Sequence, residues 1–135
     1  MASGGLYHET TLQELKAAAV DLGVASEIKS LNGDTILTAT LPHGRALVQV
    51  HSVKGGPVGE MIVFAARAAR AGASEAQANA WNRVHNFATV SVDGDGTPWI
   101  AMQVAIHGGV SKDFLRMRFA IFDVVLDHFH RAFGP

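Results

Sequence analysis

The chain has 135 residues; 48% are hydrophobic and 17% are charged, a balance that favours a folded globular protein over a disordered chain. Eleven basic and twelve acidic side chains leave a formal net charge of −1, so no basic surplus indicates nucleic-acid binding. The lack of cysteine excludes disulfides, thiol catalysis and thiolate metal sites. No apolar run approaches the length of a membrane span, and the N-terminus has no signal-peptide core, so we expect a cytoplasmic protein.

The N-terminal part of the sequence predicts a tail followed by a helix. We expect residues 1–10 to be a flexible tail and residues 11–135 to form one domain. Thr11 and Glu14 have the spacing of a capping box, and Gly23 stands where a helix commonly ends. The first helix is therefore predicted from Thr11 to Leu22.

Three strands are predicted after this helix. The Asn32-Gly33 dipeptide is a strong hairpin signal, and it joins two strand candidates, Val24–Ser30 and Asp34–Leu41. A further strand alternates between apolar and mixed positions from Ala46 to His51. The segment Lys54–Pro57 is predicted as a loop.

The middle of the chain predicts a fourth strand and a second helix. Gly59–Ala66 begins as a strand, but the alanine-rich residues Ala65–Ala71 also have helical propensity, so both structures remain open there. Ser74 opens a helix by capping-box spacing, and this helix is predicted to end near His85. Trp81 and Val84 lie three residues apart, so both are expected on its inner face.

The C-terminal part predicts a hairpin and a long helix. Residues 87–92 and 99–107 each alternate between one strongly apolar face and one mixed face, on either side of the turn Asp93–Gly96. Such strands are typical of an antiparallel sheet covered by helices on one side. Ser111 then caps a helix that continues to about Phe133. The sequence thus predicts a two-layer α+β fold with five to six strands, in the order helix, three or four strands, helix, two strands, helix.

The stretch between the second and last helices resembles a known family. Four features in order carry the resemblance: Ala80-Trp81-Asn82, Phe87-Ala88, the Asp93–Gly96 turn ahead of Trp99, and Gly108-Gly109-Val110. Together they resemble the centre of the YbjN family, bacterial proteins described as sensory transduction regulators. The resemblance implies a regulatory role and a fold similar to that of type III secretion chaperones.

The family motif is expected to be structural. We expect Asn82 to cap backbone groups near the hairpin, and the two tryptophans to pack against the sheet or the turn. The motif residues to which we assign a structural role are Trp81, Asn82, Asp93, Asp95, Trp99, Gly108 and Gly109.

The last helix carries more apolar surface than one sheet face covers. An inner stripe of this helix consists of Leu115, Phe119, Phe122, Leu126, Phe129 and Phe133. Beside it runs a second stripe, here called the outer stripe, which consists of Phe114, Met117, Ile121 and Val124. Together they span roughly 200°, about twice the stripe of an ordinary surface helix. The outer stripe is a candidate interface with a second copy or a client chain; the alternative is that the first and second helices cover it. Arg118 lies between the stripes, where its head can pair with a carboxylate.

The sequence shows no catalytic constellation. His128 and His130 point to different faces of the last helix, and the other histidines lie on separate elements. The Asp93–Gly96 turn resembles the start of a calcium loop, but Val104 stands where such a loop needs a glutamate. We therefore predict no catalytic residue, no cofactor and no metal.

Three functions remain open at this point, and the plainest of them is a structural subunit whose apolar surface serves dimer formation alone. The leading hypothesis is a non-enzymatic protein-binding module, a homodimer that acts as a regulator or chaperone-like protein through apolar helix and sheet surfaces, without nucleic acid or membrane. The alternative is a small-ligand sensor or enzyme with a pocket between sheet and helices. Its candidate polar groups are Gln49, Gln103, His107 and Arg118.

Overall fold

The computed structural model describes residues 6–52 and 58–135. The helices and strands follow one another along the chain in the predicted order. The elements are α1 (Leu12–Asp21), β1 (Ala25–Leu31), β2 (Asp34–Leu41), β3 (Gly44–His51), β4 (Met61–Arg67), α2 (Glu75–Val84), β5 (Thr89–Val92), β6 (Pro98–Ala105) and α3 (Lys112–Phe133).

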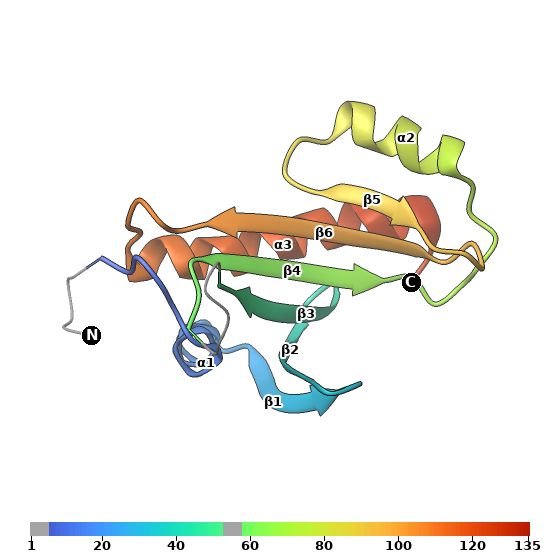
Figure 1. The fold of residues 1–135 in the computed structure, drawn as a ribbon. Coiled ribbons are helices and arrows are strands. Elements are labelled where there is room, and N and C mark those ends of the chain that lie inside the picture. Colours follow the sequence, from blue (N-terminus) through green and yellow to red (C-terminus); the bar gives the residue numbers. More distant parts are fainter. Residues whose placement is uncertain (1–5, 53–57) are drawn as a thin grey trace.

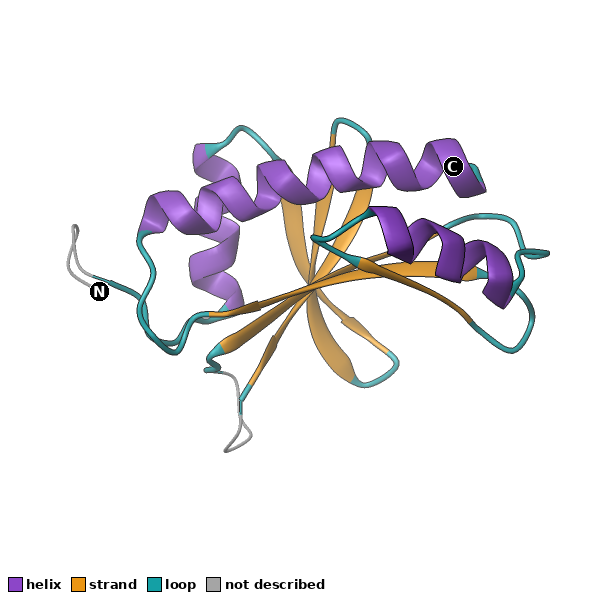
Figure 2. Ribbon diagram, turned by 90° about the horizontal axis from the view of Figure 1, so that it is seen from above, coloured by secondary structure: helices purple, strands orange, loops and turns teal. Residues whose placement is uncertain are grey.

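The strands form one antiparallel sheet in the order β1-β2-β3-β4-β6-β5. Tight turns join its hairpins; between β1 and β2, Asn32 and Gly33 both have positive φ angles, 52° and 87°, as a two-residue hairpin requires. The strands fan out strongly, and the β1–β2 hairpin projects away from the helices (Figure 2).

All three helices lie on one face of the sheet, so the predicted two-layer α+β fold is confirmed (Figures 1 and 2). The core lies between the two layers. Phe64 on β4 is fully buried, and its ring centroid lies 5.1 Å from that of Phe119 and 5.5 Å from that of Phe122 on α3. Burial of such rings, in an edge-to-face arrangement for Phe119, is the main force that holds α3 to the sheet.

Local signals start the helices as expected. The Thr11 hydroxyl accepts a hydrogen bond from the Glu14 amide at 3.2 Å, and Ser74 and Gln77 form a complete capping box. Ser111 caps α3 by accepting from the Phe114 amide at 3.1 Å. Each cap satisfies a backbone N–H group that the first helical turn leaves free.

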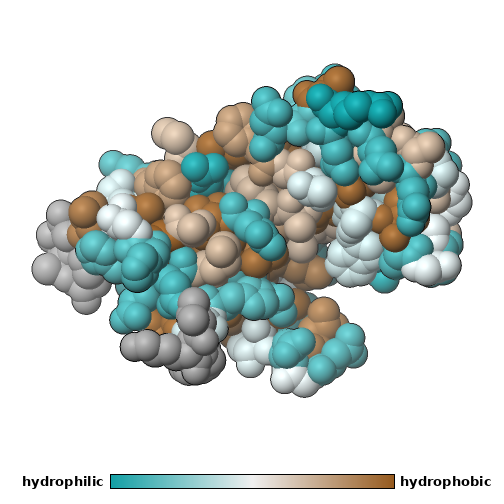
Figure 3. Space-filling view, turned by 45° about the horizontal axis from the view of Figure 1, so that its top comes forward, coloured by the Kyte–Doolittle hydropathy of each residue, from teal (hydrophilic) through white to brown (hydrophobic). Residues whose placement is uncertain are grey.

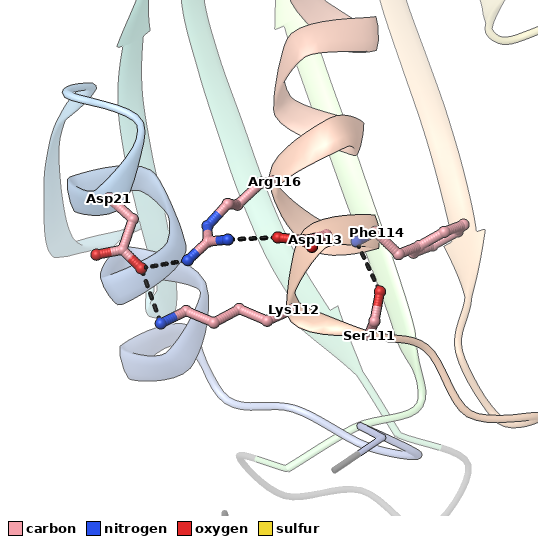
Figure 4. A network of polar contacts seen from close by, with 6 residues as sticks. All are labelled: Asp21, Ser111, Lys112, Asp113, Phe114 and Arg116. Atoms are coloured by element: carbon pink, nitrogen blue, oxygen red, sulfur yellow. Dashed lines mark hydrogen bonds and ion pairs between the residues drawn. The ribbon is translucent and has the colours of Figure 1, made fainter. Parts of the chain in front are cut away.

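A network of charges ties the end of α1 to the start of α3 (Figure 4). Asp21 Oδ2 lies 2.8 Å from Lys112 Nζ and 3.0 Å from Arg116 Nη2, and Arg116 also pairs with Asp113. An acid at a helix C-terminus and a base at a helix N-terminus each interact unfavourably with the helix dipole. The network brings these unfavourable charges together so that they neutralise one another.

Three segments differ from the sequence predictions or extend them. Residues 6–10, predicted as the end of a flexible tail, instead pair with the domain: Tyr7 bridges Val110, and buried Thr10 bridges Gly59. The fourth strand runs on to Arg67, and Ala65–Ala71 contains no helix. The predicted loop Lys54–Pro57 lies outside the described residues.

Candidate functional site

The outer stripe of α3 is open to solvent along the edge that lies farther from the core. Met117 is 61% exposed and Val124 is 56% exposed, whereas Phe114 and Ile121 are half-buried against the core. Met117 and Val124 are seven residues apart, about two helical turns, so they lie on the same side of the helix. In the described part of the chain neither α1 nor α2 covers these two side chains. Burial within the chain therefore accounts for the edge of the stripe formed by Phe114 and Ile121 and leaves the edge formed by Met117 and Val124 open.

A cation borders the outer stripe. The guanidinium carbon of Arg118 lies 4.6 Å from the ring centroid of Phe114, within the range of a cation–π interaction. The sequence places this residue where its head can pair with a carboxylate, but none of the carboxylates in residues 6–52 and 58–135 forms an ion pair with it. The stripe therefore presents apolar side chains beside a positive charge.

The outer stripe extends toward the end of α2. His128 lies one helical turn beyond Val124, and its ring centroid is 5.6 Å from that of His85. The His85 ring stacks on Trp81 at 3.8 Å. The prediction that Val84 shares the inner face with Trp81 is wrong, since Val84 is 73% exposed. The helix ends there, and the His85 ring takes the place on Trp81 that the prediction gave to Val84.

Phe87 adds to the apolar surface at this end of the molecule. It follows α2 in the chain and is 61% exposed. Sequence reasoning included Phe87 in the family motif but gave it no binding role. Its neighbour Ala88 is buried. Because successive side chains of a strand point to opposite faces, this alternation in the sequence is the signal that Phe87 points away from the core.

The open face of the sheet carries a hollow of about 480 Å³. Figure 3 shows it as a notch between the projecting β1–β2 hairpin and the strands above, with hydrophobic residues across the middle of this side. Ile36 lines it and is 3% exposed although it lies on the uncovered face, because the twisted hairpin folds over it. Cationic side chains surround the apolar lining: Lys29, Arg45 and Arg67.

Trp99 stands at one wall of this hollow and is held in place by the turn before it. Its indole Nε1 donates to Asp93 Oδ2 at 3.1 Å, and Arg67 lies 5.6 Å from the ring centroid. The other Asp93 oxygen accepts from the backbone N–H groups of Asp95 and Thr97. A side-chain hydrogen bond with Asp95, together with the Trp99 indole and these amides, lowers the pKa of Asp93 to about 2. Both aspartates thus accept hydrogen bonds within the turn and stabilise it. Of the two tryptophans, Trp99 lies on the open face of the sheet and Trp81 is buried in the core.

Asn82 seals the β5 edge of the sheet. Its side-chain amide donates to the Val90 carbonyl at 2.9 Å, and its oxygen accepts from the Val90 amide at 2.7 Å. The side chain therefore takes the place of a neighbouring strand. This is the backbone contact near the hairpin that the sequence predicted for Asn82.

The Gly108-Gly109 pair lies where the N-terminal segment crosses the loop before α3. Gly109 has φ +94°, and an added Cβ there would lie 2.8 Å from His8 Cε1. Gly108 has open space around it. Close passage of the N-terminal segment accounts for Gly109, and nothing in the structure explains Gly108.

The polar residues nominated for a ligand pocket between sheet and helices do not converge. Gln49 and Gln103 lie on the open face, His107 follows β6, and Arg118 is on α3. Residues 6–52 and 58–135 also contain no group of three or more His, Asp or Glu placed to hold a metal ion. No helix of this described part is long and apolar enough to cross a membrane.

Comparison with known proteins agrees with this architecture. Residues 11–135 match the model of the YbjN family, described as "putative bacterial sensory transduction regulator". A crystal structure of "YbjN, a putative transcription regulator from E. coli" has a similar fold, with a TM-score of 0.60 and 17% sequence identity over 96% of this chain and 92% of that chain. No curated protein matches the sequence.

Three helices on one face of an open antiparallel sheet, with exposed apolar side chains on the longest helix, define a two-layer α+β protein. The family match extends from the cap of α1 to the last residue. The chain belongs to the YbjN family, and this membership supports a regulatory or sensory-transduction role.

Proposed function

We propose that this YbjN-family protein is a non-enzymatic regulator that works as a homodimer and binds another protein on the outer stripe of α3. One observation carries the proposal: Met117 and Val124 are more than half exposed along one edge of an apolar stripe. Exposed large apolar side chains that gather on one surface mark interaction sites. The description of the family as regulators supports a role through contact with a partner.

The length of the surface indicates the kind of segment that fits it. From Phe114 at the start of the outer stripe to His128 beyond its end, the surface spans fifteen residues, about 21 Å along the helix axis. An amphipathic helix of similar length would lay its apolar face along the stripe, as helices do in other grooves and surfaces. Arg118 beside the stripe favours a partner with an acidic side chain at the matching position.

Photo-crosslinking in cells tests the proposal. A photoreactive side chain at Met117 should give a covalent adduct of defined mass with a partner protein, and the additional change Val124→Asp should remove this adduct. The matched control is the same side chain at Val20, which is also 61% exposed but lies on α1. The isolated variants should melt like the wild type, because both positions are solvent-exposed.

The mass of the adduct separates the possible occupants. A heterologous adduct at position 117 supports the proposal, whereas an adduct of twice the chain mass would make the outer stripe a self-interface. The same adducts at positions 117 and 20, or an adduct that persists with Val124→Asp, would contradict the proposal.

A small-ligand sensor is the second candidate, and the hollow on the open face is the observation that favours it. Its volume lies within the range of ligand sites, and it combines an apolar lining with the cations Lys29, Arg45 and Arg67. Anilinonaphthalene sulfonate, an apolar anion, is a suitable probe. Saturable binding that Arg45→Ala and Arg67→Ala each weaken would support this function, and equal binding by all three proteins would contradict it.

A further inference from the structure

The two edge strands of the sheet, β5 and β1, differ in whether their outer backbone groups have hydrogen-bond partners. At the β5 edge the Asn82 side chain occupies the hydrogen-bonding groups of Val90. At the opposite edge, β1 has seven residues, and no strand of the described chain pairs with its outer side. An open edge of this length is a template for another strand.

The backbone groups on the outer side of β1 can be identified. The Glu27 carbonyl accepts a hydrogen bond from the Thr38 hydroxyl at 3.3 Å, so it faces β2. Backbone groups of successive residues alternate between the two sides of a strand. The N–H and C=O groups of Ser26, Ile28 and Ser30 therefore point outward, away from β2.

We propose that β1 pairs antiparallel with β1 of a second copy of this chain, around a two-fold axis at Ile28. Ile28 then faces Ile28 of the partner subunit, and Ser26 faces Ser30 of the partner subunit. The backbone N–H and C=O groups of Ser26, Ile28 and Ser30 point outward, so each facing pair of these residues exchanges two hydrogen bonds. The sheets of the two copies join into one continuous sheet, with the helices of both copies on the same face.

The charges on β1 select this register. Around the two-fold axis at Ile28, Glu27 lies opposite Lys29 of the partner subunit, and the symmetry repeats this attractive pair. A shift of the register by two residues in one direction would place Glu27 opposite Glu27 of the partner subunit. A shift by two residues in the other direction would place Lys29 opposite Lys29 of the partner subunit. Both alternatives bring like charges together. A shift of one residue would turn the side chains of β1 to the wrong face.

Apolar side chains near the edge contribute to the pairing. Leu31 at the end of β1 is 46% exposed, and the register places it opposite Ala25 of the partner subunit. One seven-residue strand pair buries less area than a standard stable interface, so we expect a dimer that dissociates on dilution. This inference rests on the homodimer of the proposed function but uses no residue of the outer stripe, so the two fail separately.

Charge exchange tests the pairing by sedimentation across a dilution series. Glu27 and Lys29 are exposed, so Glu27→Lys and Lys29→Glu should fold like the wild type. Each single change turns both attractive pairs into repulsive ones and should weaken the dimer by roughly tenfold or more. The double variant Glu27→Lys/Lys29→Glu should restore it, and an equimolar mixture of the two single variants should form a heterodimer. Val124→Asp should leave the dimer unchanged.

Two further variants examine the edge and the register. Ser30→Pro removes an outward N–H group without touching the β2 ladder, and it should abolish the dimer while the melting temperature stays close to that of the wild type. Because the chain has no cysteine, Ile28→Cys should cross-link to itself on oxidation, and Ser30→Cys should not.

Four outcomes would overturn the inference. They are a wild-type monomer at every concentration, a dimer that survives Ser30→Pro, single charge variants that the double variant does not rescue, and equal oxidative cross-linking of Ile28→Cys and Ser30→Cys.

Discussion

The inner and outer stripes of α3 are made of the same kinds of side chain but have opposite surroundings. On the inner stripe Phe119, Phe122 and Phe129 are fully buried between α3 and the sheet. On the outer stripe Met117 and Val124 face solvent. Hydrophobic character alone therefore says little about the role of a residue on this helix; the surface that it faces decides.

Polar contacts hold α3 in place without covering the outer stripe. Near its start, Lys112 and Arg116 bind Asp21 of α1. At its middle, Asp123 accepts from the backbone and the ring of His43, at 2.8 and 2.9 Å, in the turn between β2 and β3. The helix is thus fixed by its inner stripe and by lateral contacts, and Met117 and Val124 stay exposed to solvent.

The largest expected difference between the stripes is in stability. Phe119→Ala should lower the free energy of unfolding by about 3–5 kcal/mol, because it removes a buried ring that packs on Phe64 and leaves a cavity. Met117→Ala should change it by no more than about 0.5 kcal/mol, since the side chain already lies in water. Unfolding in urea measures both. A loss above about 2 kcal/mol for Met117→Ala would show that this side chain is buried, and the contrast between the stripes would fail.

A smaller effect is expected from the lateral contact between α1 and α3. Asp21→Asn should lower the melting temperature by a few degrees at low salt and by less at high salt, since the ion pairs are partly exposed. Lys112 and Arg116 lower the pKa of Asp21, so its contribution is present above pH 3.8 and is lost as the pH falls through the lowered pKa.

Asp127→Asn is the matched control for this contact. It removes an ion pair with Arg131 inside α3 rather than one between helices, so its effect should be smaller still. Equal losses for Asp21→Asn and Asp127→Asn would mean that the contact between the helices contributes no more than a pair within one helix.

Local signals in the sequence predicted most of the fold. The caps at Thr11 and Ser74, the Asn32-Gly33 turn and the alternation around Asp93–Gly96 each act over a few residues, so their outcome depends little on the rest of the chain. The element order and the helix-covered sheet face followed from them.

The features that escaped prediction depend on distant parts of the chain. Residues 6–10 are ordered by contacts with Gly59 and Val110, and Ile36 is buried because the whole sheet twists. The width of the apolar arc of α3 was readable from its periodicity. The same periodicity did not predict which part of the outer stripe stays exposed, because this depends on the core, which shields Phe114 and Ile121 and leaves Met117 exposed.

The smallest expected effect is a pH dependence at the lateral contact between α3 and the turn that joins β2 to β3. The hydrogen bond to Asp123 raises the pKa of His43 above 6.5 in the folded protein. The stabilisation is therefore complete below pH 6.5 and is lost as the pH rises through the raised pKa. The wild type should lose slightly more melting temperature between mildly acidic and mildly basic pH than His43→Gln or Asp123→Asn, measured by circular dichroism. If His43→Gln shows the same slope as the wild type, the His43 ring and Asp123 add no pH-dependent stability, and only the backbone hydrogen bond from residue 43 to Asp123 remains as a lateral contact at the middle of α3.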